Sequence, residues 1–482
     1  MPPKPAPSAT GQERVGDPTA WFSSLALSSP LAQAIDVLGF TQMTPIQQHA
    51  LPTLLAGKDV IAQARTGSGK TVAFGLALLT FVDLRVAGVQ ALVLVPTREL
   101  ADQVTTELRR LARFIANLRV VTLCGGVPVR TQTSSLRKAP HVVVGTPGRI
   151  LDHLERGTLE LRTLRVLVLD EADRMLDMGF LDAIGRVVEQ TPNARQTLLF
   201  SATYPPEIRT LSRTLQREPR TVTVDDAVSH VDVDQLFFDV EPARKLDALA
   251  ALLLKHQPET ALVFCHTRND VRDVTTRLQE RGFSALALHG ELEQRERDEV
   301  LLRFANKSCA VLVATDVAAR GLDIKGLAAV VSWELPTDPD IHIHRVGRTG
   351  RAGHKGLAWT LCSQRERARL VPIERAAGVP ARWSRVPDLG GTLDGGTGAL
   401  TPSPPPMKTL IIEGGRQDKL RAGDLLGALT GDIGLPGDVV GKIDLAARHT
   451  YVAIRSDRAD AALRGLRAGK IKGKSFRVWL LE

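Results

Sequence analysis

Short runs of apolar and often β-branched residues recur along the chain, separated by segments of helical pattern. Such runs have no polar face, which predicts strands buried on both sides, as in a parallel sheet covered by helices. The first five runs lie at 59–63, 91–96, 141–146, 166–173 and 196–203. They predict an α/β domain over residues 19–224, preceded by a proline-rich lead at 1–18 that has too few apolar residues to fold.

A second set of apolar runs repeats the pattern further along the chain. These runs lie at 261–267, 285–290, 309–316, 328–336 and 356–363. They predict a second parallel-sheet domain over 236–386. The polar and acidic residues between the two sets, 225–235, are expected to form a linker.

The last part of the chain has a different pattern. Residues 387–406 are dense in Gly, Pro and Thr and are expected to form a flexible tether. Residues 407–482 then predict the order strand, helix, strand, strand, helix, strand. This split β-α-β order is typical of RNA-recognition modules, so we expect a small α+β domain of that kind.

Composition adds a preference for polyanionic partners. The 482 residues are too many for one core, and 62 Lys and Arg against 53 Asp and Glu give a net charge of +9. Residues 407–482 alone carry 14 basic against nine acidic residues. Nucleic acid is therefore the expected ligand class, with the third domain as a basic anchor.

The cysteines and the hydropathy indicate a cytoplasmic protein. The four cysteines are far apart and form no C-x-x-C pair, so neither a disulfide framework nor a zinc site is expected. No segment has the apolar length of a membrane span or the pattern of a secretory signal.

A phosphate-binding loop follows the first apolar run. Small residues there allow backbone N–H groups to approach phosphates, the Lys70 ammonium neutralises phosphate charge, and the Thr71 hydroxyl can bind Mg²⁺. The first position of the usual pattern is occupied by Ala64 rather than Gly. The loop comprises Ala64, Arg65, Thr66, Gly67, Ser68, Gly69, Lys70 and Thr71. This segment predicts binding of ATP with Mg²⁺.

Two adjacent carboxylates end the run at 166–170. Asp170 and Glu171 are expected at the carboxyl edge of the sheet, where ligands of such folds bind. Asp170 can hold Mg²⁺ through its hydration shell, and Glu171 can accept a proton from an attacking water. Together with the phosphate loop, this pair predicts a nucleoside triphosphatase.

Three arginines spaced by three residues lie in the second domain, at 345, 348 and 351. Guanidinium groups that enter from another domain can stabilise the charge on a transferring phosphoryl group. They would make hydrolysis depend on closure of the two domains.

Taken in order, these motifs resemble the DEAD-box RNA helicases of superfamily 2 over roughly residues 20–375. The resemblance implies two tandem RecA-like domains and assigns Arg348 and Arg351 as arginine fingers, with Arg345 supporting the phosphate network. Residues 39–47 resemble the adenine-reading Q motif, in which Gln47 would bind adenine and Phe22 would stack on it. Met43 and His342 depart from the family's usual Pro and Tyr.

The same resemblance implies further site residues in both domains. In the first domain the RNA-backbone contacts would be Pro96, Thr97, Arg98, Gly125, Gly126, Thr146, Pro147, Gly148 and Arg149. Coupling between the nucleotide and RNA sites would fall to Ser201, Ala202 and Thr203. In the second domain the RNA contacts would be Arg268, Gly290, Gln294, Arg297, Thr315 and Asp316, and the nucleotide contacts Gly321 and Asp323.

The third domain resembles the C-terminal domain of the DbpA group of bacterial helicases, which binds a hairpin of 23S ribosomal RNA near the peptidyl-transferase centre. The implied RNA-binding residues are Lys442, Tyr451, Arg455, Lys470, Lys472 and Lys474. Only Tyr451 marks the central strands as a stacking surface, which is fewer aromatics than an RNA-recognition domain normally uses.

These resemblances predict an ATP-dependent RNA helicase that separates short duplexes locally. It would act as a cytoplasmic monomer that the third domain targets to 23S ribosomal RNA during large-subunit assembly. Two alternatives remain open at this point. One is a general RNA-remodelling helicase without ribosomal specificity, and the other is an ATP-dependent RNA clamp or scaffold.

Overall fold

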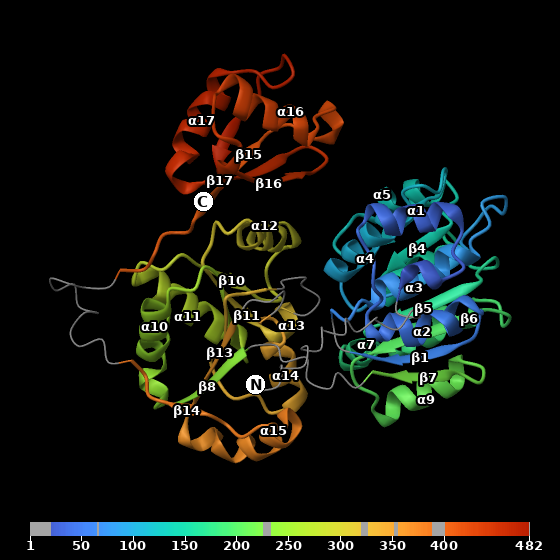
Figure 1. Ribbon diagram of the computed structural model, residues 1–482, viewed down its shortest axis with the longest axis horizontal. Coiled ribbons are helices and arrows are strands. Elements are labelled where there is room, and N and C mark those ends of the chain that lie inside the picture. The colour runs from blue at the N-terminus through green and yellow to red at the C-terminus, as the bar shows by residue number, and fades with distance from the viewer. Residues whose placement is uncertain are drawn as a thin grey trace, which may run out of the picture. The chain divides into compact units, whose positions relative to one another are not determined.

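The computed structural model describes residues 21–64, 67–224, 233–319, 326–350, 355–387 and 401–481 (Figure 1). The chain divides into two compact units. One unit holds the first predicted domain, and the other holds the second and third. The predicted lead at 1–18 and most of the predicted tether at 387–406 lie outside the described residues.

The first domain is built on a parallel seven-stranded sheet in the order β3-β4-β2-β5-β6-β1-β7 (Figure 1). Five strands coincide with the predicted apolar runs, and β3 and β7 complete the edges. The strands are β1 (Val60–Gln63), β2 (Ala91–Leu94), β3 (Val120–Leu123), β4 (Val142–Gly145), β5 (Val166–Asp170), β6 (Gln196–Ser201) and β7 (Arg220–Thr223).

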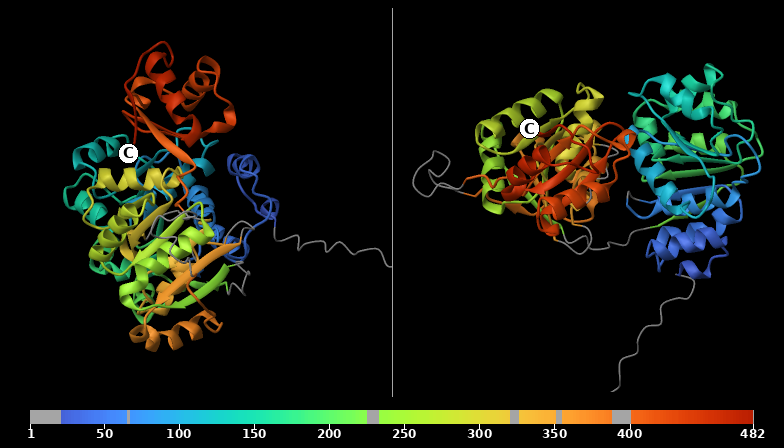
Figure 2. Two further views of the ribbon diagram at one scale, coloured as in Figure 1. Left: turned by 90° about the vertical axis from the view of Figure 1, so that its left-hand side faces the viewer. Right: turned by 90° about the horizontal axis from the view of Figure 1, so that it is seen from above.

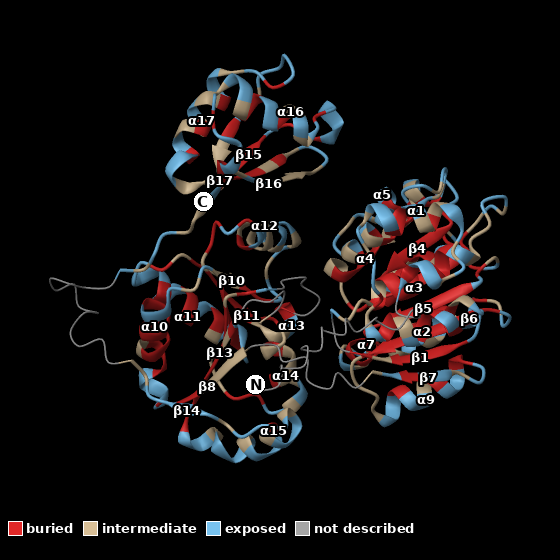
Figure 3. Cartoon of the chain, in the orientation of Figure 1, coloured by how far each residue is buried: buried red, intermediate tan, exposed pale blue. Residues whose placement is uncertain are grey.

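Helices cover both faces of this sheet, which explains why its strands have no polar side (Figure 3). Along β5, Val166 and Val168 pack under one helical layer, and Leu167 and Leu169 pack under the other. The first layer consists of α1 (Ser29–Val37), α2 (Pro45–Leu55), α3 (Lys70–Phe81) and α4 (Arg98–Leu111). The second consists of α5 (Val129–Leu136), α6 (Pro147–Glu155), α7 (Ala172–Asp177), α8 (Leu181–Glu189) and α9 (Pro206–Leu215).

The second domain repeats this architecture with the sheet order β10-β11-β9-β12-β13-β8-β14. Its parallel strands are β8 (Val233–Asp239), β9 (Ala261–Cys265), β10 (Ala285–Leu288), β11 (Val311–Thr315), β12 (Ala329–Ser332), β13 (Gly356–Cys362) and β14 (Trp383–Ser384). Its helices are α10 (Lys245–His256), α11 (Arg268–Glu280), α12 (Gln294–Ala305), α13 (Asp316–Ala319), α14 (Pro339–Val346) and α15 (Leu370–Ala377). Strand β8 includes residues 233–235, so the end of the predicted linker is sheet; residues 225–232 lie outside the described part.

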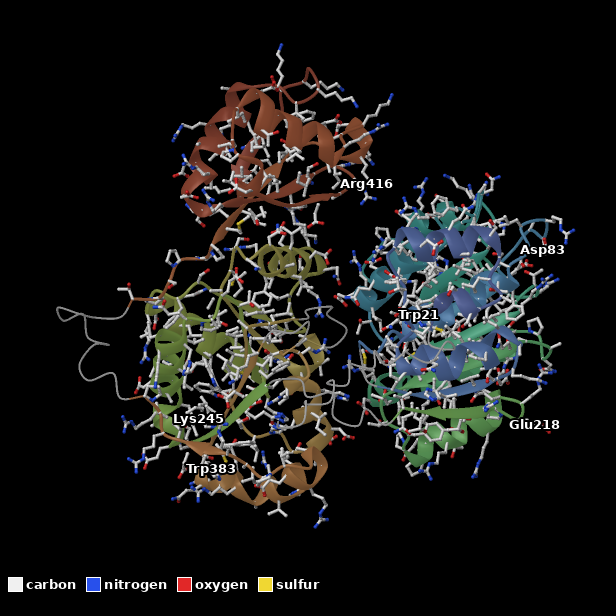
Figure 4. All side chains as sticks on the ribbon, in the orientation of Figure 1. Trp21, Asp83, Glu218, Lys245, Trp383 and Arg416 are labelled. Carbon is white, nitrogen blue, oxygen red and sulfur yellow. The ribbon has the colours of Figure 1, made fainter. Side chains whose placement is uncertain are left out.

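A buried ion pair helps to fix the second domain. The Lys245 ammonium at the start of α10 lies 3.0 Å from the Glu366 carboxylate and donates to the Trp333 carbonyl at 2.9 Å (Figure 4). Glu366 also accepts from the Leu335 N–H at 3.2 Å. Because these groups come from segments far apart in the chain, the pair ties α10 to the end of β12 and to the segment before α15.

The third domain has the predicted order of strands and helices (Figure 2). Its four-stranded antiparallel sheet has the order β16-β17-β15-β18. The elements are β15 (Met407–Ile412), α16 (Ala422–Gly427), β16 (Val440–Leu445), β17 (Thr450–Arg455), α17 (Ala459–Ala468) and β18 (Val478–Leu480). The two helices bury Leu425 and Leu466 against one face of the sheet, which presents Leu410 and Val452.

The opposite face of this small sheet carries Thr409, which is buried against the second domain's residues Asn306 and Ser308. The Thr409 hydroxyl lies 2.7 Å from that of Ser308 and accepts from the Asn306 amide at 3.2 Å. The predicted architecture is therefore confirmed: two RecA-like parallel-sheet domains followed by a small α+β domain. Within the described residues, none of the helices has the length and apolar character needed to cross a bilayer.

Candidate nucleotide and RNA sites

The strand order separates two groups of predicted site residues in the first domain. The phosphate loop follows β1, Asp170 and Glu171 lie at the end of β5, and the predicted coupling residues begin at the end of β6. The predicted RNA residues follow β2, β3 and β4. Because β5-β6-β1 and β3-β4-β2 are each contiguous in the sheet, the two groups occupy different halves of one carboxyl edge.

The second domain divides in the same way. Its predicted RNA residues follow β9, β10 and β11, which are neighbours at one side of the sheet. Arg345 and Arg348 lie at the end of α14 and just beyond it, after β12. In each domain the predicted RNA residues and the predicted nucleotide residues therefore lie on different halves of the carboxyl edge.

The phosphate loop has the backbone that anion binding requires. Gly67 and Gly69 have φ values of +90° and +93°, a region that favours glycine, and α3 begins at Lys70. A Cβ at Gly69 would collide with the Gln47 amide, so this position has no room for a side chain. Arg65 and Thr66 lie outside the described residues.

Two polar side chains of the loop are available for phosphate. The Lys70 ammonium is buried and donates to the Ala64 carbonyl at 2.9 Å, which holds it over the loop. The Ser68 hydroxyl is buried and, among the described residues, lacks a hydrogen-bond partner. A buried orphan hydroxyl beside a buried lysine fits a site that is completed by an anionic ligand.

Gln47 connects the predicted adenine site to the phosphate loop. Its Oε1 accepts from the Thr44 N–H at 2.8 Å, and its Nε2 donates to the Gly69 carbonyl at 3.0 Å. The Thr44 hydroxyl donates to the Ser68 carbonyl at 2.6 Å. An amide side chain retains one donor and one acceptor site after these contacts, so adenine binding by Gln47 stays compatible with the geometry.

Phe22 occupies a more protected place than the sequence suggested. Its ring is buried and stacks on Phe40, with centroids 6.2 Å apart. In this structure the ring therefore contributes to the core of the first domain, and its stacking on adenine stays a prediction.

Asp170 is a buried carboxyl at the end of β5. Its Oδ1 accepts from the Glu171 N–H at 3.0 Å. Burial raises its pKa from 3.8 to about 6, an effect that the Lys70 ammonium opposes and the Glu171 carboxylate reinforces. A cation bound nearby would favour the ionised form of this group.

Glu171 has a left-handed backbone, with φ +55° and ψ +52°. Its Oε2 accepts from Arg174 Nη1 at 2.9 Å, and both side chains are buried. Arg174 is not among the site residues predicted from the sequence. The signal that could have found it is its spacing, since residues i and i+3 lie on the same side of a helical turn.

Asp173 links the acidic strand end to the predicted coupling residues. Its Oδ2 accepts from the Ala202 N–H at 3.1 Å, the Thr203 N–H at 2.8 Å and the Thr203 hydroxyl at 3.1 Å. The Asp173 N–H donates to the Ser201 hydroxyl at 3.2 Å. These bonds join the start of α7 to the end of β6, so a shift of either segment is transmitted to the other.

This donor set fits ATP with Mg²⁺. The described residues contain no group of three or more His, Cys, Asp or Glu side chains placed to hold a metal ion. Mg²⁺ in phosphate-transfer sites commonly takes only one or two protein ligands and completes its shell with phosphate oxygens and water. Thr71 at the start of α3 and the buried Asp170 supply ligands of that type.

The predicted RNA residues of the first domain lie on loops and at helix starts. The Thr97 hydroxyl accepts from the Leu100 N–H at 3.3 Å and caps α4, and Gly125 and Gly126 are exposed. The Arg149 guanidinium donates to the Val127 carbonyl at 2.7 Å, which fixes the loop between β3 and α5. Exposed backbone next to fixed turns is suited to contacts with a phosphate–sugar chain.

The predicted RNA residues of the second domain have intramolecular partners in this structure. Arg268 forms an ion pair with Glu291, and the Gln294 amide donates to Asp298 at 2.8 Å. The Arg297 guanidinium donates to the Ala318 carbonyl at 2.7 Å. RNA would therefore have to replace or share these contacts.

Arg345 is held by groups of its own domain. Its guanidinium is buried, donates twice to Asp316, at 2.6 and 2.8 Å, and once to the Glu334 carbonyl at 3.2 Å. The predicted phosphate-network residue is thus bound to a predicted RNA residue. Arg348 is also buried, whereas Arg351, Gly321 and Asp323 lie outside the described residues.

His342, which replaces the family's usual Tyr, fills the core behind these arginines. Its ring is buried and stacks on Phe237, with centroids 5.8 Å apart. Burial, with a contribution from Arg345, lowers its pKa to about 4. A neutral ring at physiological pH is therefore expected, so the departure from Tyr preserves an aromatic packing group.

In the third domain the predicted basic residues differ in their surroundings. Lys442 pairs with Asp444 at 3.0 Å, and Arg455 pairs with Asp457 at 2.7 Å. Residues 470–474 instead form an exposed turn, closed by a bridge between Ile471 and Lys474, that presents Lys470, Lys472 and Lys474 to solvent. Of these three, Lys472 donates to the Lys419 carbonyl at 3.1 Å and pairs with Asp424 at 3.5 Å.

Tyr451 is partly buried. It lies on the inner strand β17, next to the edge strand β16, and burial together with Glu299 of α12 raises its pKa. The charged groups that act on the Tyr451 hydroxyl are thus side chains of the second domain. The Lys470–Lys474 turn is more open to RNA than this ring, so the predicted stacking role of Tyr451 has weaker geometric support than the lysines.

The first domain combines a phosphate loop and acidic strand end with an RNA-type edge, and the same chain contains a second domain of that architecture. Such a pair of domains defines a P-loop helicase. Comparison with known families agrees. Residues 44–211 match the DEAD/DEAH box helicase family, residues 244–353 match the helicase conserved C-terminal domain, and residues 409–480 match the DbpA RNA binding domain.

Comparison with individual relatives shows more closely which helicases the chain resembles. The chain is 51% identical over 462 residues to the ATP-dependent RNA helicase DbpA of Escherichia coli (strain K12), covering 96% of this chain and 99% of the relative. It is 44% identical over 375 residues to the DEAD-box ATP-dependent RNA helicase CshA of Bacillus cereus, covering 78% of this chain and 71% of the relative. The chain therefore belongs to the DEAD-box family of ATP-dependent RNA helicases, and it carries a DbpA-type RNA-binding domain.

A solved structure shows the same arrangement of elements. S. cerevisiae Dbp5 bound to RNA and ADP BeF3 matches with a TM-score of 0.69 at 31% identity, covering 78% of this chain and 98% of Dbp5. The enzyme class and the RNA-binding domain predicted from the sequence are thereby confirmed.

Proposed function

We propose that this helicase uses ATP to separate short duplexes in 23S ribosomal RNA during assembly of the large ribosomal subunit. The observation that carries the proposal is the division of each carboxyl edge into a nucleotide half and an RNA half, in a chain that also contains an exposed lysine turn on a DbpA-type domain. The 51% identity to a DbpA helicase over nearly the whole chain supports the ribosomal target.

In the proposed ATP site of the first domain, each group would have a separate role in binding the nucleotide. Backbone N–H groups of residues 64–71 would bind the phosphates, and Lys70 would neutralise charge on the β- and γ-phosphates. Thr71 and Asp170 would hold Mg²⁺, which when bound screens phosphate charge and orients the triphosphate. Gln47 would read the adenine, with Phe22 close to the same ring.

Hydrolysis would depend on Glu171 and on two arginines of the second domain. Glu171 would accept a proton from the water that attacks the γ-phosphate. Arg348 and Arg351 would stabilise the negative charge of the transferring phosphoryl group. Because these arginines belong to another domain, hydrolysis would require both domains to engage the same nucleotide.

RNA would bind along the β3-β4-β2 half of the first domain and the β10-β11-β9 half of the second. The candidate contacts are backbone glycines, hydroxyls and arginines, which recognise phosphates and sugars rather than base edges. The two core domains would therefore bind RNA with little sequence preference. A strand held in a shape that a continuous duplex cannot adopt would lose a few base pairs locally.

Sequence selectivity would come from the third domain. The exposed turn with Lys470, Lys472 and Lys474 supplies positive charge at a site where glycines allow close approach of an RNA backbone. Holding one hairpin of 23S RNA raises the effective concentration of the core on neighbouring duplexes. We infer that the protein binds its target RNA as a monomer in the cytoplasm, where ribosomal subunits are assembled.

A direct test compares ATPase rates without RNA, with a 23S fragment that contains the peptidyl-transferase hairpin, and with an unrelated RNA of equal length. We expect the 23S fragment to stimulate much more strongly, and a variant with Lys470, Lys472 and Lys474 replaced by Gln to lose that preference. Equal stimulation by both RNAs would instead indicate a general RNA-remodelling helicase. Stimulated ATPase without any release of duplex strands would indicate a clamp.

A further inference from the structure

The guanidinium of Arg174 and the carboxylate of Glu171 form an ion pair out of contact with solvent. Arg174 Nη1 donates to Glu171 Oε2 at 2.9 Å, and the two side chains are only 8% and 7% exposed. Surface ion pairs of this i, i+3 spacing are weak because water and salt screen them. A buried pair is different, since loss of one partner leaves an uncompensated charge.

Each of the three carboxylates at the end of β5 has its own counterpart. Asp170 faces the Lys70 ammonium, and Asp173 accepts the hydrogen bonds from Ala202 and Thr203. Arg174 contacts Glu171 through the ion pair described above. Loss of Arg174 would remove this hydrogen bond from the Glu171 carboxylate.

The backbone of Glu171 is fixed as well as its side chain. The residue adopts a left-handed conformation, which is uncommon for residues with a Cβ and is found at functional sites. Its carbonyl accepts from the N–H groups of Arg174 and Met175, both at 3.1 Å, in the first turn of α7. The side chain is thus held at both ends, by the helix start and by the guanidinium.

We propose that Arg174 is a positioning residue for ATP hydrolysis, which holds the Glu171 carboxylate in the orientation that faces the attacking water. This inference rests on the proposed role of Glu171 as the proton acceptor. In the step, the water oxygen bonds to the γ-phosphorus, and the bond from that phosphorus to the β–γ bridging oxygen breaks, so that ADP leaves with the electron pair. The water proton passes to a Glu171 oxygen, and Arg174 keeps all its protons.

The test compares R174Q with wild type in RNA-stimulated ATPase across pH 5.5–9, with R186Q as the control. Arg186 lies on α8 in an exposed pair with Glu155, so its loss should leave the rate unchanged. We expect R174Q to lower kcat by at least about tenfold while KM for ATP changes less than about twofold, because misplacing a reacting group affects the transition state. A raised KM with unchanged kcat would overturn the proposal.

Two further variants separate positioning from folding and from the role of Glu171. R174K keeps the charge but lacks the planar guanidinium, so kcat should fall; a wild-type kcat would overturn positioning. In a double-mutant cycle, R174Q should add little to the loss caused by E171Q, whereas additive losses would indicate a structural role. If E171Q alone retains full ATPase activity, the proposed proton acceptor itself is wrong, whatever R174Q does.

Discussion

Arg345 and Asp316 form a two-point ion pair inside the second domain, with Nη2 to Oδ2 at 2.6 Å and Nε to Oδ1 at 2.8 Å. Arg345 lies in the last turn of α14, after strand β12, and Asp316 begins α13, after strand β11. The pair therefore joins the predicted nucleotide half of this carboxyl edge to its predicted RNA half. A displacement caused by ligand on one side would move the loop that serves the other.

Removal of Arg345 should destabilise the second domain. The Arg345 side chain is 2% exposed and that of Asp316 is 15% exposed, so R345A leaves a poorly solvated carboxylate. We expect the free energy of unfolding to fall by about 3–5 kcal/mol, the usual cost of breaking a buried ion pair, as measured by urea denaturation. The control is R367Q, which breaks the exposed pair with Asp239 and should cost less than about 1 kcal/mol. Similar losses of unfolding free energy in both variants would show that the buried pair stabilises the domain no more than the exposed pair does.

Asp173 should affect strand separation more than ATP turnover. Its Oδ2 accepts three hydrogen bonds from Ala202 and Thr203, and an Asn side chain cannot accept all of them if its NH2 group takes that place. We expect D173N to release fewer duplex strands per ATP hydrolysed, when both are measured in the same reaction. T203V, which removes only the hydroxyl bond at 3.1 Å, should have a smaller effect. An unchanged ratio in D173N would contradict the coupling role.

Asp170 should make the stability of the nucleotide-free protein depend on pH. Burial raises its pKa in the folded state from 3.8 to about 6, so the folded form binds a proton more readily than the unfolded form between these values. This contribution to stability is present below about pH 4 and is lost as the pH rises through 6, by up to about 3 kcal/mol.

The D170N variant cannot ionise and should not show this loss. Its melting temperature, measured in EDTA without nucleotide, should exceed that of wild type above pH 6, and the difference should shrink toward pH 4. A difference that is constant across this range would mean that Asp170 does not titrate there. With Mg²⁺ and ATP present the order should reverse, because the variant loses a ligand for the cation.

The lysine turn of the third domain should determine how strongly salt weakens binding to the 23S hairpin. Each lysine that neutralises a phosphate releases counterions, so replacing Lys470, Lys472 and Lys474 by Gln should reduce the slope of log Kd against log salt by about 2. Replacing the ion-paired Lys442 should change it by less than about 0.5, since Asp444 already compensates its charge. Equal effects of both replacements would show that the turn is not the main contact.

The positions of the main strands and of the phosphate loop followed from the sequence. Continuous apolar runs such as 91–94 and 166–170 identify strands buried on both faces, and a loop of small residues before a helix identifies a phosphate site. Strands β7 and β14 were not predicted, because edge strands that are short or carry exposed and charged residues lack a continuous apolar run. In β7, Val222 is buried between exposed neighbours.

The side-chain partners could not be read from the sequence. The place of Arg345 in an arginine-rich motif predicts a role in the phosphate network, but it does not reveal that the side chain pairs with Asp316, 29 residues away. Arg174 has a visible spacing from Glu171, yet spacing alone does not reveal that the pair is buried. Tyr451 looked like a stacking residue, and only the packed structure shows its charged neighbours on α12.

The most direct test of the proposed function is strand displacement on two substrates that differ only in the attached hairpin. A short duplex joined to the 23S peptidyl-transferase hairpin is compared with the same duplex joined to a scrambled hairpin, with and without ATP. The account predicts ATP-dependent release that is much faster on the 23S substrate, and loss of this difference when Lys470, Lys472 and Lys474 are replaced by Gln. Equal release from both substrates, or release without ATP, would contradict a ribosomal RNA helicase targeted by its third domain.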